Sequence, residues 1–328
     1  MSKQKKQKRK TIFLYTFPLI LFVLLGCLNH RKSEAEYNVG DKVGSIVVDG
    51  LKRTYLIHIP ASFNKIKSMP LLIAMHGGGG SGINMERLTL GGFNKLANKE
   101  EFIVVYPDAI GRHWNDGRNL TIYYSQRENV DDVGFISLLI DHLAAELNID
   151  RKRVYVAGIS NGAMMAYRLA CELSKKIAAI ASVAGSMSEN LALNCSPSKA
   201  ISVLVMHGMN DPLIPFDGGE VHFGRLMLGR VLSISDTVKY WVNHNKCSYN
   251  GNKSYLLDID PNDGTRVWKK EYHNHESGTE VILYGIEGGG HTWPGGYQYL
   301  PERIIGKSSK DIDASKVIWN FFKRHSKR

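Results

Sequence analysis

Short apolar runs alternate with helical patterns along most of this chain, and no other feature constrains its fold as strongly. Such alternation is typical of an α/β fold, in which a mainly parallel central sheet has helices on both faces. The runs predicted to be strands are Ser45–Val48, Tyr55–Ile59, Leu71–His76, Phe102–Tyr106, Val154–Ile159, Ile177–Val183, Val203–His207 and Val281–Ile286. The patterns predicted to be helices are Gly134–Leu147, Ser160–Leu173, Ser233–Asn243 and Asp311–His325.

Two hairpins are expected beside these parallel strands. The turn Asp49-Gly50 separates the first two runs and predicts an antiparallel pair at one edge of the sheet. A second hairpin is expected between Tyr255–Ile259 and Arg266–Tyr272. Its acidic turn does not match a calcium loop, because a lysine stands where the bidentate Glu belongs. No internal repeat or long linker interrupts the pattern, so we predict a single domain over residues 40–328.

The N-terminus has the order of a secretory signal peptide. A cationic stretch precedes the apolar run Ile12–Leu25, which contains Pro18 and is shorter than the roughly 20 residues that span a bilayer. The run ends in Leu-Leu-Gly followed by Cys27, an order that resembles a bacterial lipobox, in which the cysteine is lipidated. An uncleaved membrane anchor and a chance cysteine after an ordinary signal peptide are the alternatives.

We therefore predict that residues 1–26 are a lipoprotein signal peptide and that residues 27–39 are a tether. The protein is expected to be exported to the bacterial cell envelope, in the periplasm, on the outer membrane or at the cell surface. Its predicted partner is a membrane, through the lipid on Cys27.

The formal net charge of +11 is concentrated at the N-terminus. Six Lys and Arg side chains lie in residues 1–26, which contain no Asp or Glu, so the rest of the chain carries only +5. This modest excess predicts no nucleic-acid partner. The four cysteines lack the paired spacing of a zinc site, and we expect neither a metal nor another cofactor.

The pattern Gly158-Ile159-Ser160-Asn161-Gly162 lies between a predicted strand and a predicted helix. Alone, a G-x-S-x-G match means little, but a strand, a sharp turn and a helix together predict a nucleophile elbow that exposes a serine hydroxyl. Ser160 is the candidate nucleophile. Because a serine of ordinary pKa reacts slowly, it needs a base, a carboxylate that orients the base, and donors for the oxyanion.

Candidates for these partners follow other predicted strands. Asp211 comes after Val203–His207, and His291 lies in a glycine-rich loop after the last strand. A turn-forming Asp-Pro pair and an ordinary loop histidine are the alternatives, but the order Ser, Asp, His is that of α/β-hydrolase triads. For the oxyanion we predict a backbone N–H of Gly77 or Gly78 together with that of Asn161.

The segment from Gly50 to Phe322 resembles the polyhydroxybutyrate depolymerase and feruloyl esterase-like family of secreted α/β-hydrolases. The resemblance implies carboxylic ester hydrolysis through an acyl-enzyme, with Ser160 as nucleophile, His291 as base and Asp211 as its orienter. It rests on Arg53-Thr54-Tyr55-Leu56, His76 to Gly82, Tyr106-Pro107-Asp108, Trp114 to Arg118, Val130 to Phe135, Gly158 to Gly162, His207-Gly208 with Asp211-Pro212, and Gly290 to Gly295.

Two departures from the family shift the expected substrate. Members that attack solid polymer usually carry a linker and a surface-binding domain, which are not expected here, and the four-glycine loop is closer to the feruloyl and acetylxylan esterase-like branch. Feruloyl or acetyl esters of carbohydrates are thus expected, or hydroxyalkanoate oligoesters. Trp114 and Trp293 are candidates for a substrate-binding face, with core packing as the alternative. The segment Pro215–Val231 is expected to shape the acyl pocket.

The resemblance also bears on the cysteines. Relatives often have a cysteine shortly before the last strand, and this chain has none there, which favours a Cys171–Cys195 disulfide and leaves Cys247 unpaired. Two other functions remain as alternatives to an esterase: a non-catalytic ligand-binding lipoprotein on a hydrolase fold, and a peptidase.

Overall fold

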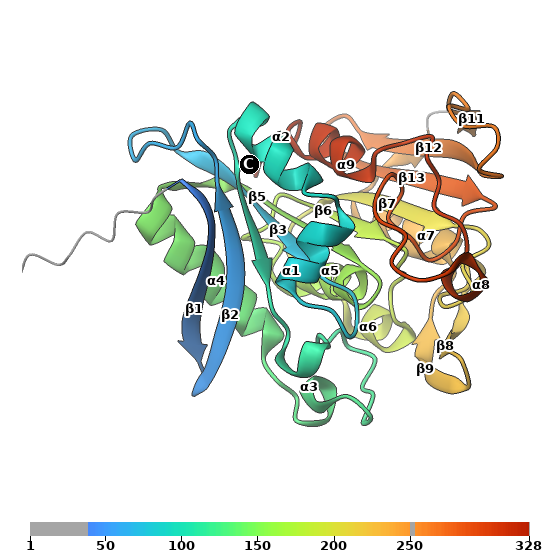
Figure 1. The fold of residues 1–328 in the computed structure, drawn as a ribbon, viewed down its shortest axis with the longest axis horizontal. Helices are drawn as coiled ribbons and strands as arrows, with labels where there is room; N and C mark the ends of the chain where they lie inside the picture. Colours follow the sequence, from blue (N-terminus) through green and yellow to red (C-terminus); the bar gives the residue numbers. More distant parts are fainter. Residues whose placement is uncertain (1–38, 250–252, 328) are drawn as a thin grey trace, which may run out of the picture. The chain divides into compact units, whose positions relative to one another are not determined.

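An 11-stranded sheet runs through the part of the chain that the computed structural model describes, residues 39–249 and 253–327 (Figure 1). The strand order is β1-β2-β4-β3-β5-β6-β7-β13-β12-β10, with β11 paired to β12. The central pairs from β4 to β13 are parallel, which confirms the predicted α/β fold. The strands are β1 (Gly40–Val48), β2 (Leu51–Ile59), β3 (Met69–Met75), β4 (Ile103–Pro107), β5 (Ile149–Ile159), β6 (Ala179–Val183), β7 (Ser202–Gly208), β10 (Ser248–Tyr249), β11 (Ser254–Tyr255), β12 (Arg266–Asn274) and β13 (Thr279–Glu287).

Helices cover both faces of this sheet (Figure 1). One face carries α1 (Gly82–Leu88), α2 (Gly92–Glu100) and α9 (Ala314–Phe322), and the other carries α4 (Asp132–Leu147), α5 (Asn161–Glu172) and α7 (Ile234–His244). Four short elements lie in the connections: η1 (Ile110–Arg112), α3 (Tyr124–Arg127), α6 (Glu189–Asn194) and α8 (Glu302–Ile305).

In the core under α9, alternate side chains of the strands pack against aromatic side chains of the helix. Alternate residues of β5, among them Tyr155, are buried on this face, since side chains alternate along a strand. Phe322 stacks on Tyr155 with ring centroids 4.9 Å apart, and Trp319 stacks on Phe102 at 3.6 Å. The helix is shorter than predicted because Asp313 caps its first turn by accepting a hydrogen bond from the N–H of Lys316.

Both predicted hairpins are present, but the second is shorter than expected. β1 and β2 pair antiparallel at one edge of the sheet, as predicted. β11 contributes only Ser254 and Tyr255 to the pairing with β12. Further along, the N–H of Ile259 donates to the Asp311 carboxylate instead of a neighbouring strand (2.8 Å).

A separate two-stranded sheet was not predicted. β8 (Gly219–Phe223) and β9 (Leu226–Val231) form a hairpin whose tip contains Gly224 with φ 60°. Residues from Val39 onward form one compact unit. In the described part of the chain, no helix has the length and apolar character needed to cross a bilayer. The predicted signal peptide, Cys27 and nearly all of the tether lie outside the described residues.

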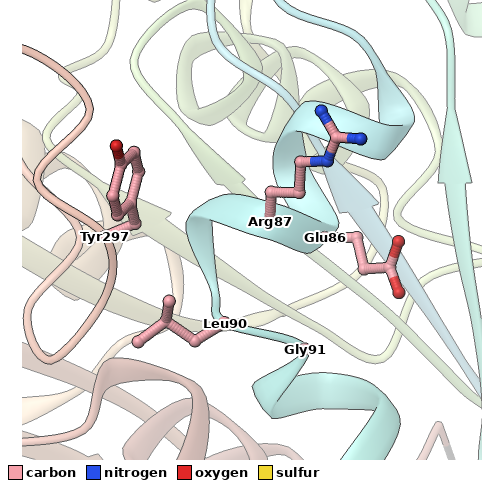
Figure 2. A pocket seen from close by; sticks show the side chains of 5 residues that line it. All are labelled: Glu86, Arg87, Leu90, Gly91 and Tyr297. Carbon is pink, nitrogen blue, oxygen red and sulfur yellow. The ribbon is translucent and has the colours of Figure 1, made fainter.

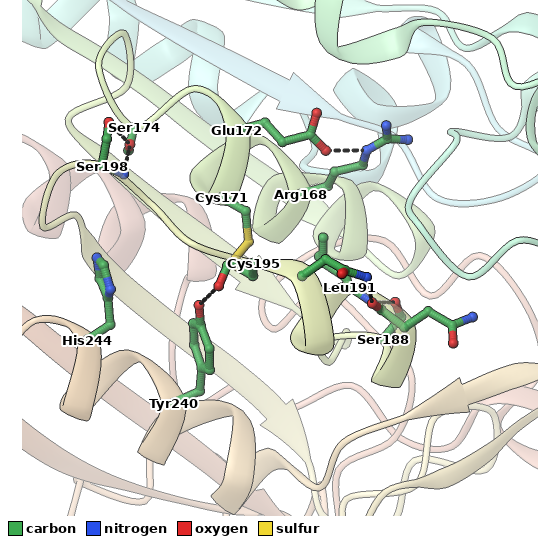
Figure 3. Close-up of a disulfide and its surroundings, with 12 residues drawn as sticks. Arg168, Cys171, Glu172, Ser174, Ser188, Leu191, Cys195, Ser198, Tyr240 and His244 are labelled. Carbon is green, nitrogen blue, oxygen red and sulfur yellow. Dashed lines mark hydrogen bonds and ion pairs between the residues drawn. A yellow bond between two sulfur atoms is a disulfide. The ribbon is translucent and has the colours of Figure 1, made fainter.

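A disulfide joins Cys171 to Cys195, as the family resemblance implied (Figure 3). Cys171 lies near the end of α5 and Cys195 directly follows α6, so the bond ties these two helices through cysteines that are 24 residues apart in sequence. The Tyr240 hydroxyl donates to the carbonyl oxygen of Cys195 (2.8 Å). Cys247 is a free, half-buried thiol.

The double variant C171S/C195S should lower the free energy of unfolding by about 3 kcal/mol. The disulfide joins cysteines 24 residues apart, and closing a loop of that length restricts the unfolded chain. Urea unfolding of the oxidised protein and the variant measures the difference. Cys247→Ser is the matched control and should change stability little. A double variant as stable as the parent would contradict the prediction.

Candidate active site

The turn from β5 into α5 holds Ser160 in a strained backbone conformation, with φ 57° and ψ −123°. The glycines on either side allow the packing that enforces it. A Cβ atom on Gly158 would lie 2.4 Å from the carbonyl oxygen of Gly162, and one on Gly162 would lie 2.5 Å from that of His76. Strand, turn and helix can approach this closely only with glycine at both positions, so the predicted elbow geometry is present.

The Ser160 hydroxyl faces a cleft at the N-terminus of α5. The side chain is half-buried, and its Oγ makes no hydrogen bond within the described residues. The backbone is held firmly, because the Ser160 N–H donates to Val183 (3.0 Å) and its carbonyl accepts from Met164 (2.9 Å). The positive end of the α5 dipole therefore lies beside a hydroxyl that is free to react.

His291 reaches the same cleft, and Asp211 lies buried beside it in the loop of a neighbouring strand. Asp211 follows β7 and His291 follows β13, and because these strands pair in parallel their loops leave the same edge of the sheet. His291 Nδ1 lies 2.7 Å from Asp211 Oδ2, and both side chains are buried. With Nδ1–H donating to the carboxylate, Nε2 is left as an acceptor. His291 and Ser160 line one cleft, but within the described residues no hydrogen bond joins Ser160 Oγ to His291 Nε2.

The Asp211 carboxylate is held as an anion. Its Oδ1 accepts the N–H groups of Leu213 (2.8 Å) and Ile214 (2.9 Å). Burial alone would raise the pKa of Asp211, but the adjoining His291 and the hydrogen bond from the Ile214 N–H outweigh it, and the pKa lies below its ordinary value. A charged acceptor is thus in place for His291.

His207 is a second histidine at this carboxylate and was not predicted to have a role. Its Nε2 lies 3.5 Å from Asp211 Oδ2 and donates to the carbonyl oxygen of Ile214 (2.9 Å). Burial lowers the pKa of His207 despite the opposing effect of Asp211, so the ring stays neutral. The signal that could have pointed to it is the pair His207-Gly208 at the end of the strand that precedes Asp211.

The loop after β3 is oriented by His76. The His76 Nδ1–H donates to the carbonyl oxygen of Gly77 (2.7 Å), which also accepts the N–H of Gly80 (3.1 Å). In a trans peptide the N–H points opposite to the carbonyl, so the N–H of Gly78 points away from the His76 ring. A Cβ atom on Gly78 would lie 3.8 Å from Asn161 Cβ, which puts the two predicted oxyanion residues side by side.

Asn161 is clamped by a loop that was not predicted to have this role. Its Oδ1 accepts the N–H of Trp114 (2.7 Å), and its Nδ2 donates to Asp116 (2.6 Å) and to the Trp114 carbonyl (3.1 Å). Asp116 is fully buried and also binds Arg118 through two hydrogen bonds to its Oδ2. Within the described residues, the N–H groups of Gly77, Gly78 and Asn161 have no protein acceptor.

The predicted substrate-binding role of Trp114 and Trp293 is wrong. Both indoles are buried, at 0% and 1% exposure, and neither lines the cleft. Trp114 Nε1 donates to the carbonyl oxygen of His76 (3.0 Å), and Trp293 Nε1 donates to Ser315 Oγ (3.2 Å). Indoles of this size bury more apolar surface in the core than at a cleft, and each finds a partner for its N–H there. They support the loops that carry the site.

The cleft has a volume of about 840 Å³, within the range of small-molecule sites. One side is apolar and is built by Met164, Leu213, Ile214, Val221 and Leu228. Val221 and Leu228 belong to the hairpin β8–β9, so the segment Pro215–Val231 does line the cleft as predicted; its role toward an acyl group stays a prediction. Within the described residues, no cluster of His, Cys, Asp or Glu is arranged to hold a metal ion.

The phospholipase/carboxylesterase family matches residues 63–226. A protein of Nocardia uniformis subsp. tsuyamanensis, named "Putative esterase NocK", is 30% identical over 285 residues, which cover 84% of this chain and 80% of that protein. This chain belongs to the phospholipase/carboxylesterase family. It is thus an α/β-hydrolase, and the predicted fold class and family are confirmed.

Other relatives of this chain carry more specific names. Feruloyl esterase B of Piromyces equi is 27% identical over 248 residues, which cover 73% of this chain but only 42% of that protein. Feruloyl esterase D of Neurospora crassa is 24% identical over 84% of this chain and 83% of its own length. The solved acetyl xylan esterase from Aspergillus awamori has a TM-score of 0.53 at 15% identity, over 86% of this chain and 99% of that one, and shows a shared fold.

The protein should lose stability as the pH falls from about 6.5 to 4, because burial lowers the pKa of His76 from its ordinary 6.5 to about 4. Across this window the unfolded chain binds more protons than the folded one, and the shift corresponds to about 3 kcal/mol. The measurement is urea unfolding at several pH values for the parent and for His76→Gln. Between about pH 6.5 and 4, the free energy of unfolding of the variant should fall by about 3 kcal/mol less than that of the parent. NMR titration of the His76 ring is the independent check. The prediction would be contradicted if the free energies of unfolding of parent and variant changed in parallel with pH and the His76 ring titrated near its ordinary value of about 6.5.

Proposed function

We propose that this protein is a serine ester hydrolase that works through an acyl-enzyme. One observation carries the proposal: the His291–Asp211 hydrogen bond of 2.7 Å lies in the same cleft as a serine held on a strained elbow. Ser160 is then the nucleophile, His291 the base, and Asp211 the group that holds the tautomer of His291.

In the acylation step, Ser160 Oγ attacks the ester carbonyl carbon while His291 Nε2 takes the hydroxyl proton. The carbonyl oxygen becomes an oxyanion, which the N–H groups of Gly78 and Asn161 can stabilise because no protein acceptor within the described residues occupies them. The ester C–O bond then breaks, and His291 returns its proton to the departing alcohol. Asp211 stays ionised and stabilises the imidazolium in between.

In the deacylation step, a water molecule replaces the alcohol. His291 Nε2 takes a proton from this water, and the resulting hydroxyl attacks the acyl carbon. The bond to Ser160 Oγ breaks, the serine regains the proton from His291, and the acid leaves. Each step uses only side chains and backbone groups of the cleft, and neither needs an electron donor or acceptor.

The proposed substrates are feruloyl or acetyl-type carbohydrate esters, or hydroxyalkanoate oligoesters. The apolar side of the cleft supports an acyl group with little charge. We further propose export to the cell envelope, with a membrane anchor at the lipidated Cys27, on the basis of the N-terminal sequence.

Ser160→Ala and His291→Ala should each lower kcat on p-nitrophenyl acetate at least about 10³-fold without unfolding the protein, because either change removes the nucleophile or its activation. The same assay with p-nitrophenyl butyrate, methyl ferulate, acetylated xylan and hydroxybutyrate oligomers ranks the substrates. Ser198→Ala, an exposed serine near the disulfide, is the matched control and should keep full activity. Hydrolysis that survives in Ser160→Ala would refute the proposed nucleophile.

Asp211→Asn should lower kcat about 10⁴-fold with little change in KM, because the amide N–H cannot accept from His291 and favours the wrong tautomer. Nitrogen NMR of the imidazole reports which ring nitrogen carries the proton. Activity within tenfold of the parent, or an unchanged tautomer, would contradict the role assigned to Asp211.

A further inference from the structure

Two parts of the cleft differ in how firmly they are built. The part beside α1 opens into a hollow lined by Glu86, Arg87, Leu90, Gly91 and Tyr297 (Figure 2). Leu90 and Tyr297 are 52% and 59% exposed, and Figure 2 shows the side chains of Arg87 and Glu86 extending away from both. This part of the cleft is open to solvent and is poorly suited to select a substrate by its size.

The apolar side of the cleft is instead closed by the hairpin β8–β9. Val221 and Leu228 of this hairpin line the cleft, and both are buried. The pairing of the two strands shifts register between Glu220 and His222. Leu228 and Gly229 therefore both oppose Val221, which is the arrangement of a β-bulge. Gly229 has φ 79°, which glycine adopts without strain, so the bulge is placed directly after Leu228.

Arg118 holds this bulge in place. Its Nη1 donates to the Leu228 carbonyl oxygen (2.8 Å), although the two residues lie 110 positions apart. A Cβ atom on Gly229 would lie 3.6 Å from Arg118 Cβ, so the bulge packs directly on the arginine side chain. Arg118 is 7% exposed, and a hydrogen bond from a charged donor is strong where water is excluded.

The same guanidinium also binds Asp116. Arg118 Nε and Nη2 both donate to Asp116 Oδ2, at 3.0 and 2.7 Å, and this oxygen also accepts from Asn161 Nδ2 (2.6 Å). A buried charge is costly unless it is paired, so the fully buried Asp116 depends on Arg118. Arg118 thus connects Leu228, in the wall of the cleft, to Asn161 at the predicted oxyanion site.

The bulge lies on the acyl side of the proposed reaction. The acyl group is the part of the ester that becomes bonded to Ser160, so it lies next to the start of α5. Met164 follows Ser160 by one turn of this helix, where its N–H donates to the Ser160 carbonyl (2.9 Å). The Met164 side chain belongs to the same buried cluster as Val221 and Leu228. An acyl chain that extends from Ser160 along this cluster therefore meets the bulge.

We propose that Arg118 is a positioning residue that sets the size of the acyl pocket by linking the Leu228 bulge to Asp116. A guanidinium can form this link because its nitrogens donate in several fixed directions, whereas a lysine has a single amine. The fixed wall limits the acyl chain that fits while the ester carbonyl lies beside the Asn161 N–H. This inference rests on the proposed ester hydrolysis and adds a residue that selects the acyl group by its length.

The test compares p-nitrophenyl octanoate with p-nitrophenyl acetate on the full-length protein. Arg118→Lys keeps a charge beside Asp116, but the amine takes the position of the guanidinium carbon and does not reach the Leu228 carbonyl. The released bulge can then yield to a longer chain. The ratio of kcat/KM on the octanoate to kcat/KM on the acetate should rise about tenfold, the effect of one hydrogen bond to a charged group.

A second variant guards against the cost of an unpaired buried charge. The double variant D116N/R118Q removes both charges together, so neither partner is left alone in the core. Its shorter side chain at position 118 also lacks the hydrogen bond to Leu228. The ratio should therefore rise as it does in Arg118→Lys, even if the rates on both esters fall.

Arg53→Lys is the matched control. Arg53 forms a comparable buried ion pair with Asp132 (2.5 Å), and neither of these two residues lines the cleft. This variant makes the same exchange beside a buried aspartate and should keep the ratio of the parent. An unchanged ratio in Arg118→Lys, or an equal rise in Arg53→Lys, would overturn the inference.

Hydrolysis of octyl acetate separates the acyl side from the alcohol side. A rise on octyl acetate in place of p-nitrophenyl octanoate would mean that the bulge contacts the alcohol, and the inference would fall. If the parent hydrolyses these esters and the Arg118 variants keep its ratio, ester hydrolysis stands and only the inference falls. If the folded parent hydrolyses none of them, the proposed function fails and the inference fails with it.

Discussion

The close approach of three backbones at the elbow is the constraint on which the rest of the site depends. β3 and β5 are hydrogen-bonded neighbours, and the start of α5 packs against the last residues of β3 with no side chain between them. Gly158 and Gly162 are the positions where even a methyl group would collide with backbone atoms. This contact holds Ser160 in its strained conformation and also sets the glycine loop after β3 beside it.

The strand order of the sheet brings Asp211 and His291 to the site. Each predicted catalytic side chain follows a parallel strand, and parallel strands that are neighbours release their loops at one edge. The pair β7–β13 brings Asp211 and His291 within hydrogen-bond distance although they lie 80 residues apart. Burial lowers the pKa of His76 and of His207, so both rings are neutral. Because the ring beside Asp211 carries no charge, the charge of Asp211 is available to His291.

What could be predicted from the sequence was local or followed from strand order. The eight predicted strands and four predicted helices are present, because each has its own apolar period. The Ser, Asp and His candidates could be named because each follows a strand in the α/β-hydrolase order. The helices α1 and α2 and the hairpin β8–β9 were missed, because α1 and α2 are too short to show a clear period and the hairpin is interrupted by three glycines.

The errors and omissions at the site concern which way a side chain points. Trp114 and Trp293 lie in the right loops, but their sequence neighbours do not say whether an indole faces the cleft or the core. The hydrogen bond between the Asp116 and Asn161 side chains joins residues 45 positions apart, so no local sequence pattern predicts it.

Covalent labelling tests the central claim most directly. A fluorophosphonate reacts with a serine only where a base activates the hydroxyl and an oxyanion site stabilises the adduct. Intact mass and peptide mapping should find one adduct per chain, on Ser160, absent in Ser160→Ala and much slower to form in His291→Ala. A folded protein that is not labelled, or an adduct on another residue, would contradict the assignment of this cleft as a serine esterase site.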